Sequence, residues 1–395
     1  MRYGAIVPST PDAPLRVLLT NRILANRTGT ELFVRDVATG LQRRGHLPIV
    51  YSPRLGPLAA EIRGATIPVV DDLSAVAEPP DIIHGHHGLE TLTALLAFPG
   101  VPAVSVCHSW IGWPDEPVAF PRIFRYLAVD DTCRDRLVTE HGIPPDRVEV
   151  VLNAVDLGRF RPRPPLPARP ARALIFSNSS GEHAPHVRAI RAACAQAGIA
   201  VDLAGFKSGR TLDRPEETLG SYEIVFAKAR AALEAAAVGT AVVLCDVAGA
   251  GAMVTTTNVD ALRRLNFGMR TLREPPTVDG LLREIARYDA DDATAVSRRV
   301  RELAGHEVQI DQFLATYGDV LAESAAREVH ADADLRAAAD YLRRLSPKLH
   351  ERDLLRMAFA RLLHLPLAGA WMRRRARREQ PAHWFQELLR TMDGE

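Results

Sequence analysis

The sequence has few cysteines and no excess of either charge. Its four cysteines, Cys107, Cys133, Cys194 and Cys245, stand singly, and this spacing argues against a disulfide framework or a zinc site and predicts reduced thiols. The formal net charge of +1 lacks the global basic excess of a nucleic-acid binder, so we expect no nucleic-acid partner. An anionic ligand would have to be met by a local cluster of basic groups.

Long hydrophobic segments are also missing. No run reaches the roughly 20 apolar residues needed to cross a bilayer, and residues 1–15 form a short apolar patch broken by prolines, without a cleavable signal segment. We therefore expect a cytoplasmic protein. With 47% hydrophobic and 25% charged residues, the composition is typical of a soluble globular chain, and 395 residues suffice for two domains with separate cores.

Strand and helix signals alternate along two stretches of the chain. Short apolar runs at residues 15–20 and 47–52 bracket a segment with helical periodicity that stops near Gly45. The pattern repeats as far as residue 153, and such alternation predicts a doubly wound parallel sheet. It restarts after residue 170, so we expect a second sheet of the same kind.

The stretch RPRPPLPARP at residues 161–170 separates these two regions. Five prolines in ten positions exclude a regular element and predict a stiff linker. We therefore predict an α/β fold with two Rossmann-like domains facing each other across a cleft, over residues 1–160 and 171–325, the second with a closing helix at residues 310–324. Ligands of open α/β sheets bind at the carboxyl ends of the strands, so both domains should contribute loops to the cleft. We expect residues 326–395 to form a basic helical extension.

A turn in the first domain is a candidate binding element. In NRTGTELFVRD, Thr28, Gly29 and Thr30 lie where a helix is expected to begin after a strand. Backbone N–H groups at such a helix start can bind an anion or sugar hydroxyls. The alternative is a turn that only needs glycine for its backbone conformation.

Histidines follow two of the expected strands in the first domain. His86 and His87 end one strand and His108 ends the next, so we expect these side chains to face the cleft. A zinc site built from His84, His86 and His87 is the alternative, but no further ligand is spaced for it, and we expect no metal. For His108 the alternative is a core histidine bonded to the backbone.

The segment VFAKARAALEAAAVGTAVVLCD, residues 225–246, places one carboxylate, Glu234, in an alanine-rich helix ahead of an apolar strand. A carboxylate at this place in a nucleotide-binding α/β domain can accept two hydrogen bonds from a ribose diol. Lys228 and Arg230 lie near the helix start, where charge and the helix dipole both favour a phosphate. A solvated helix face is the alternative, although the alanines around Glu234 favour close packing.

Four segments together resemble the retaining family-4 glycosyltransferases, whose architecture of two Rossmann-like domains is called GT-B. The likeness covers residues 15–325 and rests on TGTELFVRDVATGLQRRGH, on the strand ends DIIHGHH and VSVCHS, on NAVDLGRFRP and on ALEAAAVGTAVVLCD. It implies a nucleotide-diphosphate sugar as co-substrate on the second domain, an unidentified acceptor on the first, and no other cofactor. Glu234 would bind the ribose, and His108 would contact the donor sugar near the reacting carbon. Catalysis would be electrostatic, retaining and metal-independent.

The chain departs from the family pattern at two places. The first of the family's two glutamates falls at Phe226, and the basic pair expected after the first strand of the second domain is replaced by Ser177, Asn178 and Ser179. The diphosphate charge must then be met elsewhere, with Lys228 as the first candidate. The expected donor-binding set is Glu234, Lys228, Arg230, Lys207, Asn153, Ser177 and Asn178.

Two other functions fit the same fold. A nucleotide-sugar epimerase or hydrolase would need a carboxylate and a histidine for proton transfer, such as His108 with Asp115 or Glu116. A degenerate, non-catalytic nucleotide-sugar-binding protein would bind the donor without turnover.

The end of the chain is helical in pattern and basic. From residue 351, an apolar stripe precedes the run WMRRRARREQ; the stripe consists of Leu354, Leu355, Ala358, Leu362 and Leu365. A basic amphipathic helix can lie on an anionic membrane surface, which would place the protein peripherally at the inner membrane face. The favoured interpretation is a helical extension that packs on the body of the protein and has a solvated end.

Overall fold

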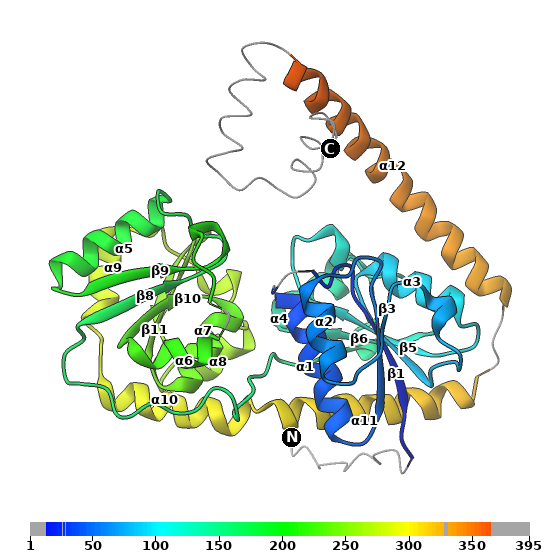
Figure 1. Ribbon diagram of the computed structural model, residues 1–395, viewed down its shortest axis with the longest axis horizontal. Helices are drawn as coiled ribbons and strands as arrows, with labels where there is room; N and C mark the ends of the chain where they lie inside the picture. Colours follow the sequence, from blue (N-terminus) through cyan, green and yellow to red (C-terminus); the bar gives the residue numbers. More distant parts are fainter. Residues whose placement is uncertain (1–12, 26, 28, 213, 328–330, 365–395) are drawn as a thin grey trace. The chain divides into compact units, whose positions relative to one another are not determined.

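The computed structural model describes residues 13–25, 27, 29–212, 214–327 and 331–364, with the side chains of Trp113 and of residues 352–364 left out. The chain divides into two compact units, Met1–Asp334 and Leu335–Glu395. Both predicted sheets lie in the first unit (Figure 1).

The first sheet is parallel and has the strand order β3-β2-β1-β4-β5-β6-β7. Its strands are β1 (Arg16–Thr20), β2 (Leu47–Tyr51), β3 (Val69–Val70), β4 (Ile82–His86), β5 (Ala103–Cys107), β6 (Ile123–Ala128) and β7 (Val148–Val150). Its helices are α1 (Gly29–Arg43), α2 (Pro57–Gly64), α3 (Gly88–Ala97) and α4 (Asp131–Asp135). The strand order reverses between β1 and β4, and open sheets of this kind bind ligands at that point.

The second sheet has the order β12-β11-β10-β8-β9. Its strands are β8 (Arg172–Phe176), β9 (Ala200–Ala204), β10 (Ile224–Ala227), β11 (Ala241–Asp246) and β12 (Gly249–Met253), and β12 alone is antiparallel to its neighbour. Its helices are α5 (Pro185–Gln196), α6 (Pro215–Thr218), α7 (Ala229–Val238), α8 (Val259–Arg264), α9 (Val278–Ile285) and α10 (Ala290–Leu303). The predicted α/β class with two Rossmann-like domains is confirmed.

Side chains alternate between the two faces of the second sheet, as a strand requires. On β10, Val225 and Ala227 pack into a core that includes α7 and α10, whereas Ile224 and Phe226 pack into a core that includes α5 and α9. Apolar residues on both faces explain why these strands are continuous hydrophobic runs in the sequence.

The helix α11 (His306–Ala325) returns to the first domain. The sequence predicted it as the closing helix of the second domain, whereas its packing partners in the structure include α1, β5 and β6. A backbone bridge pairs Val155, after β7, with Gly305, just before α11, so the two segments that join the domains lie side by side.

The helix α12 (Ala331–His364) contains Pro347, and its residues 335–364 are the described part of the second unit. Side chains of the predicted apolar stripe lie outside the described residues. Within the described part of the chain, every helix is too short or too polar to cross a membrane.

Candidate functional site

The candidate site is a cavity of about 490 Å³ lined by both domains. The first domain contributes Arg27, Gly29 and Arg35, and the segment after β7 contributes Arg159. From the second domain come Asn178, after β8, aromatic and aliphatic side chains near β9, and Arg230 and Glu234 of α7. We call this space the interdomain cavity. Four of the predicted site residues, Gly29, Asn178, Arg230 and Glu234, line it.

The way α7 joins β10 places Arg230 and Glu234. The strand ends at Ala227 and the helix begins at Ala229, so Lys228 alone connects them. Alanines at 232, 235, 236 and 237 are almost fully buried, and small side chains let α7 approach the sheet and α10 closely. Glu234 is 6% exposed, which agrees with the close packing that the sequence suggested.

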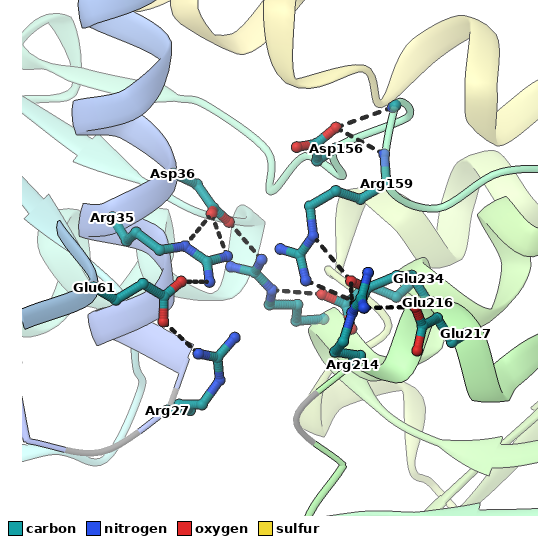
Figure 2. A network of polar contacts seen from close by, with 12 residues as sticks. Arg27, Arg35, Asp36, Glu61, Asp156, Arg159, Arg214, Glu216, Glu217 and Glu234 are labelled. Atoms are coloured by element: carbon teal, nitrogen blue, oxygen red, sulfur yellow. Dashed lines mark hydrogen bonds and ion pairs between the residues drawn. The ribbon is translucent and has the colours of Figure 1, made fainter. Parts of the chain in front are cut away.

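A charged network links α1 to α7 (Figure 2). Arg230 donates through Nε to Glu234, at 2.7 Å, and through Nη2 to Asp36, at 2.5 Å. Arg35 also donates to Asp36, from Nε at 2.9 Å and from Nη2 at 2.6 Å. Burial raises the pKa of Asp36, but Arg230 and Arg35 outweigh burial and lower it to about 2. Sequence analysis missed Asp36, because nothing local marks it.

Burial acts differently on the other two members of this network. It raises the pKa of Glu234, against the opposing charge of Arg230. Burial disfavours the charged form of Arg230, yet Asp36 and Glu234 together raise its pKa. Arg230 therefore stays protonated between two carboxylates.

Three arginines form a wall between the interdomain cavity and a neighbouring cavity of about 440 Å³. Arg27, Arg35 and Arg159 line both spaces. Their carboxylate partners Glu61 and Glu216, like Asp36, line only the neighbouring cavity. Figure 2 shows these acids beside the arginines. Among the described residues that line the interdomain cavity, Glu234 is the one carboxylate, so this side of the wall presents mainly positive charge.

The other predicted donor-binding residues do not line this cavity. Lys228 Nζ lies 3.5 Å from Asp246 Oδ2, and the same oxygen accepts a hydrogen bond from Ser177 Oγ at 2.9 Å. Lys207 is exposed and Asn153 is half-buried. Lys228 and Ser177 thus share one carboxylate at the carboxyl ends of β8, β10 and β11.

The helix start in the first domain lies at the cavity, which Gly29 lines. Gly29 and Thr30 are the first residues of α1, and Gly29 is exposed. Thr28 lies outside the described residues. A helix of this length leaves its first N–H groups free to meet an oxygen.

The histidines of the first domain pack together. His86 Nδ1 lies 2.7 Å from His108 Nε2, and His84 Nδ1 contacts the hydroxyl of Tyr317 on α11. Burial lowers the pKa values of His84 and His108 to about 3 and that of His86 well below its usual range. Elsewhere, His87 Nδ1 accepts the backbone N–H of Arg22 at 3.2 Å. In the described residues no group of three or more His, Cys, Asp or Glu side chains is arranged to hold a metal ion.

Asp115 and Phe226, both named in the sequence analysis, are buried. Asp115 is buried, and burial raises its pKa to about 6 against a backbone hydrogen bond from His108 and the charges of Arg136 and Arg22. Phe226 is 0% exposed and packs in the core on the α5 and α9 side of the second sheet. Position 226 lies on β10 itself, one residue before the strand ends, and Phe226 is a core residue.

Comparisons with known proteins give a family match and a shared fold. Residues 27–159 match the model of Glycosyltransferase Family 4. No curated protein matches the chain in sequence. A solved glycosyltransferase from Rickettsia africae superposes with a TM-score of 0.59 at 14% identity, over 78% of this chain and 99% of that one. The catalytic domain of starch synthase IV from Arabidopsis thaliana, bound to ADP and acarbose, superposes with a TM-score of 0.49 at 10% identity. The match covers 80% of this chain and 100% of that one.

Proposed function

Because the chain has the GT-B fold and the family-4 glycosyltransferase model matches its first domain, we propose that it transfers a sugar from a nucleotide-diphosphate sugar to an acceptor. The observation that supports this most directly is the composition of the interdomain cavity. It combines one buried carboxylate, Glu234, with a wall of arginines and an aromatic side. A nucleoside diphosphate offers the matching groups, namely a diol, a dianionic diphosphate and a flat base.

We place the donor in the cavity by chemistry. The base lies against Phe206, which is 53% exposed, and Phe176, since aromatic side chains stack on flat rings. The ribose diol donates to Glu234. The diphosphate meets Arg159 and Arg35, because guanidinium groups bind phosphate oxygens in bidentate fashion. A cavity of about 490 Å³ is of the size that ligand sites have, roughly 300–1,000 Å³.

Catalysis in this arrangement is mainly electrostatic. Cleavage of the bond to the sugar leaves negative charge on the diphosphate, and fixed arginines stabilise that charge as it develops. We propose that these side chains, with the start of α1 at Gly29, serve where other transferases use a metal ion. His108 would contact the sugar from the first domain. Retention of configuration rests on the family resemblance alone.

A panel of nucleotide sugars tests the proposal. Thermal unfolding of the purified chain is measured with each compound, and the compound that raises Tm most identifies the donor. Glu234→Gln keeps the shape but removes the charge that accepts the diol, so it should weaken donor binding about tenfold. Glu217→Gln is the control, because that side chain is 57% exposed and pairs with Arg214 outside the cavity.

The results separate the candidate functions. Absence of a Tm shift with every nucleotide sugar contradicts the proposal. If a donor binds, release of free sugar without acceptor indicates a hydrolase, an epimerised product indicates an epimerase, and binding without turnover in the presence of candidate acceptors indicates the non-catalytic alternative.

A further inference from the structure

His86 and His108 are joined by a hydrogen bond between their rings. His86 is the last residue of β4 and is 0% exposed, and His108 directly follows β5, the neighbouring strand. Nδ1 of His86 lies 2.7 Å from Nε2 of His108, and the ring centroids lie 5.0 Å apart. Phe33 of α1 packs edge-on against both rings, at 5.5 and 4.8 Å. These contacts hold the two imidazoles in fixed orientations.

Only one proton can lie between Nδ1 of His86 and Nε2 of His108. Two nitrogens at this distance need one donor and one acceptor, and both rings are neutral because burial lowers their pKa values. The remaining nitrogen of His86, Nε2, is buried without a hydrogen-bond partner among the described residues. An orphaned buried N–H is rarer in proteins than an unfilled acceptor. The proton of His86 is therefore on Nδ1, and Nε2 carries a bare lone pair.

This assignment fixes the tautomer of His108. Since His86 Nδ1–H donates, Nε2 of His108 accepts, and the proton of His108 must be on Nδ1. Among the described residues, the one hydrogen bond of the His108 ring is the bond to His86 through Nε2, and the side chain is half-buried. His108 then offers a ligand an N–H donor and has no free lone pair with which to act as a base.

We propose that His86 is a positioning residue that fixes His108 as a hydrogen-bond donor through Nδ1. The proposal rests on the proposed function, in which the group that His108 meets is an oxygen of the sugar donor. A donor suits a sugar hydroxyl or a developing negative charge, as electrostatic catalysis requires. This tautomer of His108 has no free lone pair, so it cannot abstract a proton as the histidine of an epimerase would.

The tautomer is measured directly by ¹⁵N NMR of the histidine rings in the whole protein, without any ligand. The expected spectrum of the wild type has protonated Nδ1 and unprotonated Nε2 in both His86 and His108. Assignment comes from the variants His86→Asn and His108→Gln. A wild-type spectrum with the proton of His108 on Nε2 overturns the proposal, whatever the protein is later found to catalyse.

Two substitutions at His86 separate positioning from packing. His86→Leu removes the N–H that bonds His108, so His108 should populate both tautomers. With the nucleotide sugar identified above, kcat should fall about tenfold and KM should change little. His86→Asn keeps an N–H group close to the place of His86 Nδ1, so both the spectrum and kcat should stay near those of the wild type. His84→Asn is the matched control, because His84 stacks on His86 but has no bond to His108.

The outcomes are distinguishable. If Asn is as harmful as Leu, or His84→Asn has the same effect, His86 acts only through packing and the proposal fails. If the tautomers behave as expected but no nucleotide sugar binds, the proposed function fails while the assignment of His86 stands. Should His86→Leu not fold, the wild-type and His86→Asn spectra still decide the question.

Discussion

Asp36 of α1 and Arg230 of α7 form an ion pair that connects the two Rossmann-like domains, although 194 residues separate them in sequence. Their side chains are 17% and 19% exposed. Arg230 also bonds Glu234, so a residue of the first domain helps to orient the carboxylate that we propose for ribose binding. The candidate site thus depends on a contact between the domains.

Replacing Asp36 with Asn should destabilise the fold. The substitution leaves Arg230 and Arg35 short of a negative partner in a half-buried place, and we expect a loss of about 2 kcal/mol in the free energy of unfolding. Urea unfolding measures this. The control is Asp311→Asn, which breaks the pair with Arg44, at 53% and 35% exposure, and should cost less than about 1 kcal/mol. Equal losses of unfolding free energy in the two variants would show that the Asp36 pair stabilises the fold no more than an exposed pair does.

The buried histidines should make stability depend on pH. Burial lowers the pKa values of His84 and His108 to about 3, below the ordinary value of 6.5. As the pH falls, the unfolded chain therefore binds protons on these histidines at a higher pH than the folded chain does. Stability is fully present above pH 6.5 and falls as the pH drops from 6.5 toward 3, by at most about 1.4 kcal/mol per pH unit for each group.

Urea unfolding at pH 7.5, 6.5 and 5.5 checks this dependence. His84→Gln should make the curve less steep, whereas His183→Gln should leave it unchanged, because His183 is exposed. A free energy of unfolding that is the same at pH 7.5 and 5.5 would contradict the burial of these rings.

Arg159 should contribute to diphosphate binding. It lies between Glu216 and the cavity, and replacing it with Gln removes a charged contact to phosphate while the base and ribose contacts remain. We expect about tenfold weaker binding of the nucleoside diphosphate and no change for the nucleoside, measured by calorimetry. Arg161→Gln is the control, since Arg161 is exposed and bonds a nearby carbonyl. Equal losses of affinity for the nucleoside diphosphate and the nucleoside would show that Arg159 does not bind the diphosphate.

Local pattern was sufficient to predict the alternation of strands and helices in two sheets, because the central apolar runs are packed on both faces and the helices between them are amphipathic. It also predicted that Glu234 lies in a closely packed helix, since small alanine side chains surround it. The antiparallel strand β12 was not predicted. Its sequence, GAGAM, has no strand signal, and Gly251 is needed because a Cβ there would lie 2.4 Å from the carbonyl oxygen of Thr271.

Long-range partners could not be predicted from the sequence. Asp36 and the arginine wall are brought to Arg230 and Glu234 only by the packing of the two domains. The same holds for Tyr317, whose helix packs on the first domain and whose hydroxyl meets His84. Counting along the family motif gives Phe226 as the position of the first glutamate, but it does not reveal that this position is in the core of the second domain.

Introducing an acid at Phe226 should therefore unfold the protein and not restore a site. Removing a fully buried aromatic side chain from a core costs roughly 3–5 kcal/mol, and an unpaired carboxyl group adds the penalty for burying a polar group. Together these approach the whole stability of an ordinary domain, about 5–15 kcal/mol. We expect Phe226→Glu to be insoluble or to melt far below the wild type. Phe226→Leu, which keeps the site apolar, should fold and bind the donor with unchanged affinity. A stable Phe226→Glu variant with altered donor binding would instead place residue 226 at the ligand.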